Sequence, residues 1–182
     1  MTKSKTTNMI LCALFTALIA VGAFIRIPVP YLPFSMQTFF VLMAGLLLGR
    51  KLGALSVFLY LLLGLIGLPI FTEGGGFGYI FKPSFGFIIG FVASAWVTGA
   101  IAFRKPSPSL PRLLGACLAG SGVVYLCGLP YYYLMSHVYV GSNIGVWPLF
   151  LYCFILTAPG DIVKSVAAAL IAKRLQPVLR RN

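Results

Sequence analysis

Long runs of apolar residues, separated by short segments rich in glycine, proline or charge, occupy most of the chain. Several runs reach the roughly 20 residues that an α-helix needs to cross a lipid bilayer, and others are barely long enough. We interpret six of them as membrane-spanning helices: Met9–Ile25, Met36–Gly49, Leu52–Ile70, Pro83–Phe103, Leu113–Met135 and Pro159–Ala172. The pattern predicts an all-α integral membrane protein in which residues 1–182 form a single six-helix domain.

The apolar segment Trp147–Leu156 has only ten residues, too few to span a bilayer as a helix. Pro148 and the Pro159-Gly160 pair bound it. We therefore predict a short re-entrant or outer-face segment here. The alternative, which the sequence leaves open, is one long kinked helix over Trp147–Ala172.

The composition identifies lipid as the solvent of this chain. Hydrophobic residues make up 60% of the sequence and charged residues 9%, whereas soluble domains have about 25% charged residues. The net charge is +12, but the basic residues are scattered in pairs between apolar runs. That distribution does not favour nucleic-acid binding. We expect a multi-pass protein of the cell membrane.

The basic residues predict an orientation. A cytoplasmic N-terminus puts eleven Lys and Arg residues on the inner side: Lys3, Lys5, Arg50, Lys51, Arg104, Lys105, Arg112, Lys173, Arg174, Arg180 and Arg181. Only Arg26 and Lys82 are then outside. Cytoplasmic loops of membrane proteins carry an excess of Lys and Arg, so both termini are predicted to be cytoplasmic.

The strongest candidate for a functional site is Asp161 with Lys164. The chain has only two acidic residues, Glu73 and Asp161, and charged groups within a membrane are costly and usually functional. Residues three apart lie on one face of a helix, so these two side chains can pair. If Pro159 starts the last helix, the pair lies in its outer first turns. The alternative is a structural salt bridge that fixes this helix against its neighbours.

Further candidates lie on the predicted outer side. The polar ones begin two of the predicted helices: Gln37, Thr38 and Ser84. Aromatic residues also crowd the outer segments, among them Tyr31, Phe34 and Tyr79. We expect these groups to form an apolar cavity with polar groups at its ends, covered by a stiff, proline-rich loop over Arg26–Ser35. The alternative for the aromatic rings is a belt at the membrane surface.

Several kinds of chemistry have little support. The cysteines Cys12, Cys117, Cys127 and Cys153 show no CxxC spacing, and His137 is the only histidine, so we predict no metal site. No phosphate-binding Walker motif occurs, and two carboxylates are few for acid–base catalysis. We expect neither an enzyme nor a bound cofactor.

Small residues at helical spacing mark faces where helices can approach closely. They occur as Ala13-x-x-x-Ala17 in the first predicted helix and as Gly86-x-x-x-Gly90 in the fourth. Packing within the chain is the default interpretation. A face for another membrane subunit is the alternative.

The chain resembles one family along essentially its whole length: the biotin-specific substrate-binding subunits, or S components, of energy-coupling factor (ECF) transporters, of the BioY type. The motifs that carry the resemblance, in this order and spacing, are Ile27-Pro-Val-Pro30, Gln37-Thr38, Gly45–Gly53, Tyr60–Pro69, the glycine-rich Gly74–Gly78, Pro83–Gly86 with Gly90-Phe91, and Pro159-Gly160-Asp161 with Lys164. One departure is Lys82–Phe87, where the family usually has Gly-Pro-Thr-Gly-Gly-Tyr.

The resemblance implies that the chain captures biotin at the outer face. It also implies a transmembrane coupling subunit and ATP-binding subunits as partners, with Ala13 and Ala17 as the docking motif. A freestanding secondary carrier for biotin or a similar solute is the alternative, although only the last helix shows the interruption that such carriers use. A membrane enzyme acting on lipid ranks last, because catalytic groups are scarce.

Overall fold

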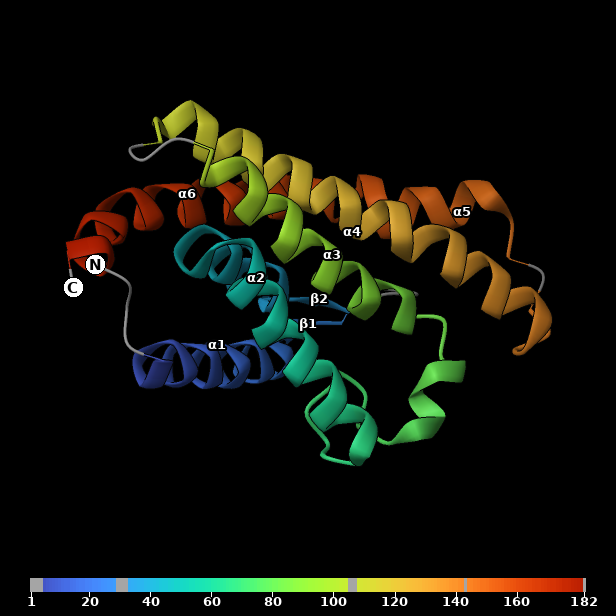
Figure 1. Ribbon diagram of the computed structural model, residues 1–182. Coiled ribbons are helices and arrows are strands. Elements are labelled where there is room, and N and C mark those ends of the chain that lie inside the picture. The colour runs from blue at the N-terminus through green and yellow to red at the C-terminus, as the bar shows by residue number, and fades with distance from the viewer. Residues whose placement is uncertain (1–4, 29–32, 105–107, 143, 182) are drawn as a thin grey trace.

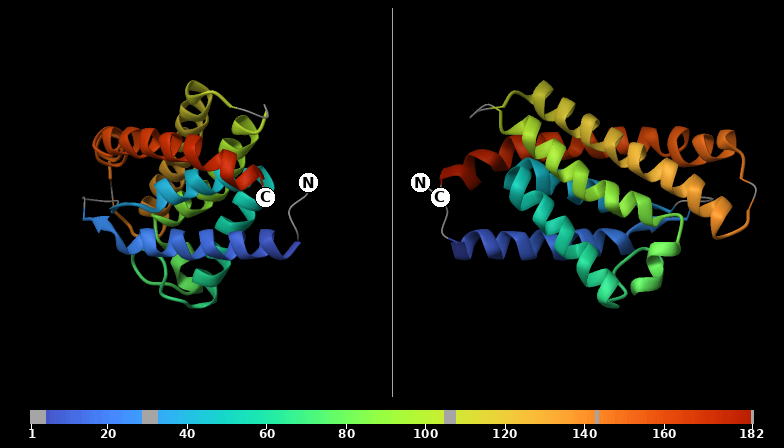
Figure 2. Two further views of the ribbon diagram at one scale, coloured as in Figure 1. Left: turned by 90° about the vertical axis from the view of Figure 1, so that its left-hand side faces the viewer. Right: turned by 45° about the vertical axis from the view of Figure 1, so that its right-hand side comes forward.

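The computed structural model describes residues 5–28, 33–104, 108–142 and 144–181. These residues form a bundle of helices in which α1 begins and α6 ends at the same end (Figure 1). The first half of α2 lies between α1 and α6 (Figure 2). The all-helical prediction is confirmed. Helices suit lipid, because backbone hydrogen bonds within each helix leave few polar groups exposed to it.

Helix α1, Lys5–Phe24, leads into a short antiparallel hairpin. Its strands are β1, Arg26–Ile27, and β2, Phe34–Ser35, with Arg26 opposite Ser35 and Ile27 opposite Phe34. The hairpin places β2 directly before α2, so its residues lie at the start of the next helix.

Helix α2, Gln37–Ile66, bends sharply at Gly49, which has φ 80° and ψ −179°. A Cβ atom at Gly53 would lie 2.8 Å from the carbonyl oxygen of Ala44, although nine residues of straight helix span about 14 Å. The chain therefore turns back on itself at Gly49. The predicted break between Met36–Gly49 and Leu52–Ile70 exists, but as a bend inside one element. The second half ends at Ile66 rather than Ile70, because Gly67 has a positive φ of 122° and caps the helix.

A single 3₁₀ turn, Phe77–Phe81, precedes α3, Phe85–Ala102, which packs between α2 and α4, Leu110–Val138. A Cβ at Gly86 would lie 2.3 Å from Tyr131, and one at Gly90 would lie 3.0 Å from Val124. The Gly86-x-x-x-Gly90 motif therefore serves close packing of α3 on α4.

The C-terminal helices correct the prediction of a re-entrant segment. Helix α5, Val146–Phe150, continues through a π-helical turn, Leu151–Ile155, into α6, Ala158–Arg181. The Leu156 N–H donates to the carbonyl of Leu151, five residues back, and the Asp161 N–H donates to Thr157. Pro148 and Pro159 do not break the run, because they lie in the first turns of α5 and α6, where an α-helix needs no N–H donor. The long kinked helix is the correct alternative.

Within the described residues, five segments are long and apolar enough to cross a membrane: Lys5–Phe24, Gln37–Ile66, Phe85–Ala102, Leu110–Val138 and Val146–Pro177. Six separate spanning helices are thus not confirmed, because the second and third predicted helices are the two halves of α2. Large apolar side chains cover the outside, such as Leu126 on α4, which is 73% exposed. An outer surface of this kind suits a protein surrounded by lipid.

Candidate functional site

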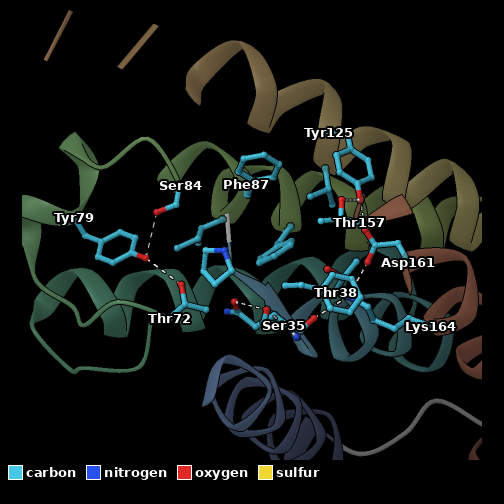
Figure 3. Close-up of a pocket in the computed structure, with 16 residues that line it drawn as sticks. Ser35, Thr38, Thr72, Tyr79, Ser84, Phe87, Tyr125, Thr157, Asp161 and Lys164 are labelled. Carbon is cyan, nitrogen blue, oxygen red and sulfur yellow. Dashed lines mark hydrogen bonds and ion pairs between the residues drawn. The ribbon is translucent and has the colours of Figure 1, made fainter. Parts of the chain in front are cut away.

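A cavity lies inside the bundle (Figure 3), with about 530 Å³ of space between its lining atoms, part of which is open to solvent. Its lining comes from the hairpin, α2, the segment before α3, α3 itself, α4 and the α5–α6 helical run: Pro33, Phe34, Ser35, Gln37, Thr38, Thr72, Tyr79, Ser84, Phe87, Ile88, Phe91, Val124, Tyr125, Thr157, Asp161 and Lys164. Polar side chains gather at two ends of the cavity, and between them lie apolar residues such as Phe87 together with the polar Ser35 (Figure 3).

The first polar end contains the pair that the sequence singles out. Lys164 Nζ lies 2.6 Å from Asp161 Oδ1, and both side chains are buried. The ammonium group also donates to the backbone carbonyl of Ser35, at 2.8 Å, and lies 3.6 Å from the ring centroid of Phe34. Strand β2 and helix α6 thus share one buried cation, which ties the hairpin to the site.

The hydroxyl group of Tyr125 orients the carboxylate and is itself in contact with Thr157. The Tyr125 hydroxyl, from α4, donates to Asp161 Oδ2 and lies 2.8 Å from Thr157 Oγ1. The Thr157 hydroxyl is itself 2.8 Å from the carbonyl oxygen of Cys153. The carboxylate is therefore held between a cation and a hydroxyl, as a buried charge requires.

A glycine makes room for the aromatic ring beneath Lys164. A Cβ atom at Gly160 would lie 2.3 Å from Cζ of Phe34. A side chain at this position would displace the Phe34 ring from α6. The Pro-Gly-Asp sequence therefore shapes the cavity wall as well as supplying the acid.

Gln37 lines the wall of the cavity, and its side-chain amide forms hydrogen bonds within the protein. Its Nε2 donates to the Tyr60 hydroxyl at 2.6 Å, and its Oε1 accepts from Ser35 Oγ at 3.1 Å. Tyr60 in turn donates to the carbonyl of Ile70 at 3.0 Å. Thr38, one residue further along α2, is buried and also faces the cavity.

The second polar end consists of three hydroxyl groups. The Tyr79 hydroxyl lies 3.3 Å from Thr72 Oγ1 and 3.4 Å from Ser84 Oγ. Apolar side chains form the wall between the two ends: Phe87, Ile88, Phe91 and Val124. The arrangement can bind an elongated molecule that is polar at both ends and apolar in the middle.

Most of the residues expected at the site line this cavity, namely Phe34, Gln37, Thr38, Tyr79, Ser84, Asp161 and Lys164. Tyr31 lies outside the described residues. Sequence analysis missed Ser35, Thr72, Tyr125 and Thr157 among the polar lining. The sequence could have identified Thr157, because it precedes Asp161 by four residues and so shares a helix face with it. For Tyr125 the sequence gives only a weak indication, a hydroxyl group in the middle of an apolar run.

The position of the charged pair along its helical run differs from the prediction. Asp161 is in the first turn of α6, but the helical run already begins at Val146. Fifteen residues of this run, Val146–Gly160, therefore precede Asp161. The pair lies near the middle of this apolar run rather than at its outer start.

Two further questions from the sequence concern metal binding and the small residues of α1. Among the described residues, His, Cys, Asp and Glu side chains form no group of three or more that could hold a metal ion. Ala13 and Ala17 are exposed on α1, so the default interpretation, packing against other helices of this chain, is wrong for them. They remain available to a partner.

Comparison with known proteins agrees with this architecture. The sequence profile described as the BioY family matches residues 1–181. A probable biotin transporter BioY of Lysinibacillus sphaericus is 39% identical over 178 residues, covering 98% of this chain and 91% of the relative. The biotin transporter BioY of Thermotoga maritima is 37% identical over 171 residues, covering 93% and 95%.

A solved structure shows the same fold. It is a crystal structure of the S-component for biotin from an ECF-type ABC transporter, with a TM-score of 0.80 and 29% sequence identity. The match covers 97% of this chain and 95% of the other.

Proposed function

The chain belongs to the BioY family, and from that premise we propose that it is the biotin-binding membrane subunit of an ATP-driven vitamin uptake transporter. It captures biotin in the cavity and works with a transmembrane coupling subunit and ATP-binding subunits. Its named relatives are transporters, which agrees with the expectation of transport rather than catalysis. With several apolar spanning helices, it is a multi-pass protein of the plasma membrane.

The proposed topology has six crossings with both termini in the cytoplasm. Its support is the bend at Gly49, which returns the chain across the bundle within α2. Arg50 and Lys51 at the bend then lie at the end of the bundle where α1 begins and α6 ends (Figure 1). An excess of basic residues at one end is typical of the cytoplasmic side.

The observation that carries the proposed ligand is the separation of two polar ends by an apolar wall. Biotin has a ureido group at one end, a carboxylate at the other, and an apolar ring and chain between them. The wall formed by Phe87, Ile88, Phe91 and Val124 suits the apolar part. The cavity therefore has the same order of polar and apolar groups as the ligand.

The contacts favour one direction of binding. Asp161 and Lys164 touch each other, so both meet the same end of the ligand. A ureido group offers N–H donors to a carboxylate and a carbonyl acceptor to an ammonium group, and so matches both members of the pair. The hydroxyl groups of Thr72, Tyr79 and Ser84 at the other end can donate to the carboxylate of biotin.

Esterification of the ligand tests this direction. Biotin methyl ester, which lacks the carboxylate charge, should bind the wild-type protein more weakly than biotin in a calorimetric titration. In Ser84→Ala the loss caused by esterification should shrink, whereas in Lys164→Met it should persist. If instead the loss shrinks in Lys164→Met and persists in Ser84→Ala, biotin binds in the opposite direction, and the proposed ligand stays the same.

Transport is tested separately. The purified chain should bind biotin without nucleotide. Cells that produce it should take up biotin only together with the coupling and ATP-binding subunits. Full uptake by the chain alone would favour the freestanding carrier, and absence of any biotin binding would contradict the proposed ligand.

A further inference from the structure

A groove lies on the surface where the bend of α2 meets the C-terminal end of α3. It is lined by residues 48–52 together with Gly99, Ala100, Phe103 and Arg104. None of these residues lines the ligand cavity. The elements that line it, the bend of α2 and the C-terminal end of α3, are at the end of the bundle where α1 begins and α6 ends (Figure 1).

The groove concentrates positive charge that no carboxylate side chain of this protein is left to neutralise. Arg50, Lys51 and Arg104 are all exposed in its lining. The sequence has only two acidic residues, and both are engaged elsewhere. Glu73 pairs with Lys82 at 3.4 Å, and Asp161 pairs with Lys164 at 2.6 Å. The counter-charge of the groove therefore comes from another molecule.

The rest of the lining is apolar. It includes Leu48, Leu52, Ala100 and the ring of Phe103, which packs 3.6 Å from the position of a Cβ atom on Gly49. A free phosphate ion would leave this apolar surface in contact with water. A molecule with an anionic head and a hydrocarbon chain covers both parts of the lining.

We propose that the groove is a binding site for an anionic phospholipid. The phosphate lies among the three cationic side chains, and an acyl chain lies along the apolar part of the groove. Cytoplasmic leaflets contain such lipids, and juxtamembrane Lys and Arg residues attract them. The site is independent of the biotin cavity, so its test does not depend on the proposed transport function.

The chain contains a natural reporter for this site. Trp96 on α3 is 49% exposed and precedes Ala100 by four residues, so the two lie on the same helix face. Trp147 is the other tryptophan, and Trp147→Phe leaves Trp96 as the only one. Bromine atoms on an acyl chain quench tryptophan fluorescence on contact. Quenching by brominated lipid therefore measures occupancy near the groove.

The experiment compares brominated phosphatidylglycerol with brominated phosphatidylcholine at equal mole fractions around the Trp147→Phe protein. The expected result is a relative binding constant of at least about fivefold in favour of phosphatidylglycerol, since one Lys or Arg near anionic lipid supplies about this factor. Combined Arg50→Gln, Lys51→Gln and Arg104→Gln should bring it to within about twofold of unity. Arg174→Gln removes an exposed basic residue from α6 and should leave the preference unchanged.

Three outcomes overturn the proposal. The first is equal quenching by both lipids in the Trp147→Phe protein, and the second is a preference that survives the triple substitution. The third is loss of the preference on adding soluble glycerol 3-phosphate, which would assign the groove to a free phosphate compound. If the triple variant does not fold, as judged by its helical circular dichroism, Lys51→Gln and Arg104→Gln are tested singly, and each should lower the preference.

Discussion

Single side chains at the charged end of the cavity depend on one another. Asp161 and Lys164 are buried and only 2.6 Å apart, so removing either leaves a buried charge without its partner. We expect Asp161→Asn or Lys164→Met to cost roughly 3–5 kcal/mol in biotin binding or in folding, a hundredfold or more in an equilibrium constant. Calorimetric titration with biotin and thermal unfolding in detergent measure the two parts of this loss.

The chain supplies a matched control for that experiment. Glu73 and Lys82 form an ion pair whose side chains are each 42% exposed, and exposed pairs contribute at most about 1 kcal/mol. Glu73→Gln should therefore change stability and affinity little. Wild-type biotin affinity in both Asp161→Asn and Lys164→Met would show that the buried pair is only structural.

Tyr125 orients Asp161 from a different helix. Its hydroxyl donates to the carboxylate and contacts Thr157, so Tyr125→Phe leaves buried oxygen atoms without a donor. The expected loss of biotin affinity is about 1–3 kcal/mol, measured by titration. Tyr139→Phe is the control, because Tyr139 is 63% exposed and its ring stacks on Phe81 without need of the hydroxyl. An equal effect of the two changes would contradict the role given to Tyr125.

At the scale of elements, the bend of α2 depends on one residue. Gly49 has φ 80° with ψ −179°, a conformation that is almost confined to glycine. Gly49→Ala should lower the free energy of unfolding by about 1–3 kcal/mol, seen as a lower midpoint of thermal unfolding in detergent.

Gly122→Ala controls for the loss of backbone freedom. Gly122 lies inside α4 with no atom within 4 Å of an added Cβ. Alanine there should be neutral or stabilise the helix by up to about 1 kcal/mol. A Gly49→Ala protein as stable as Gly122→Ala would show that the bend tolerates a side chain.

For the whole molecule, binding and coupling should occupy separate surfaces. Ala13 and Ala17 are exposed on α1, and neither lines the biotin cavity. Docking of helices in lipid relies on small side chains that let backbones approach. Ala13→Trp or Ala17→Trp should therefore abolish uptake in cells while biotin affinity stays at the wild-type value.

A bulky substitution on another lipid-facing helix controls for insertion and expression. Leu126 on α4 is 73% exposed, and Leu126→Trp should transport normally. If Ala17→Trp also transports normally, α1 is not the docking face.

The sequence by itself determined the features that depend on local spacing and on the solvent. In lipid, backbone groups must find partners within their own segment, so apolar runs of sufficient length become helices. The expected runs Pro83–Phe103 and Leu113–Met135 correspond to α3 and α4 within a few residues. The contact of Asp161 with Lys164 follows in the same way, since residues three apart share one helix face.

Only the tertiary structure decided how these helices meet. Ser35 and Lys164 are 129 residues apart in sequence but share a hydrogen bond, and Tyr125 reaches Asp161 only because α4 packs beside α6 in one register. That register depends on shape at close contacts, such as Gly90 against Val124 and Gly160 against Phe34. The continuity of α5 with α6 also escaped prediction, because a π-helical turn and first-turn prolines keep the run intact where the sequence alone suggests a break. Local spacing carries no information on such contacts, since they depend on which faces of distant helices fill the same space.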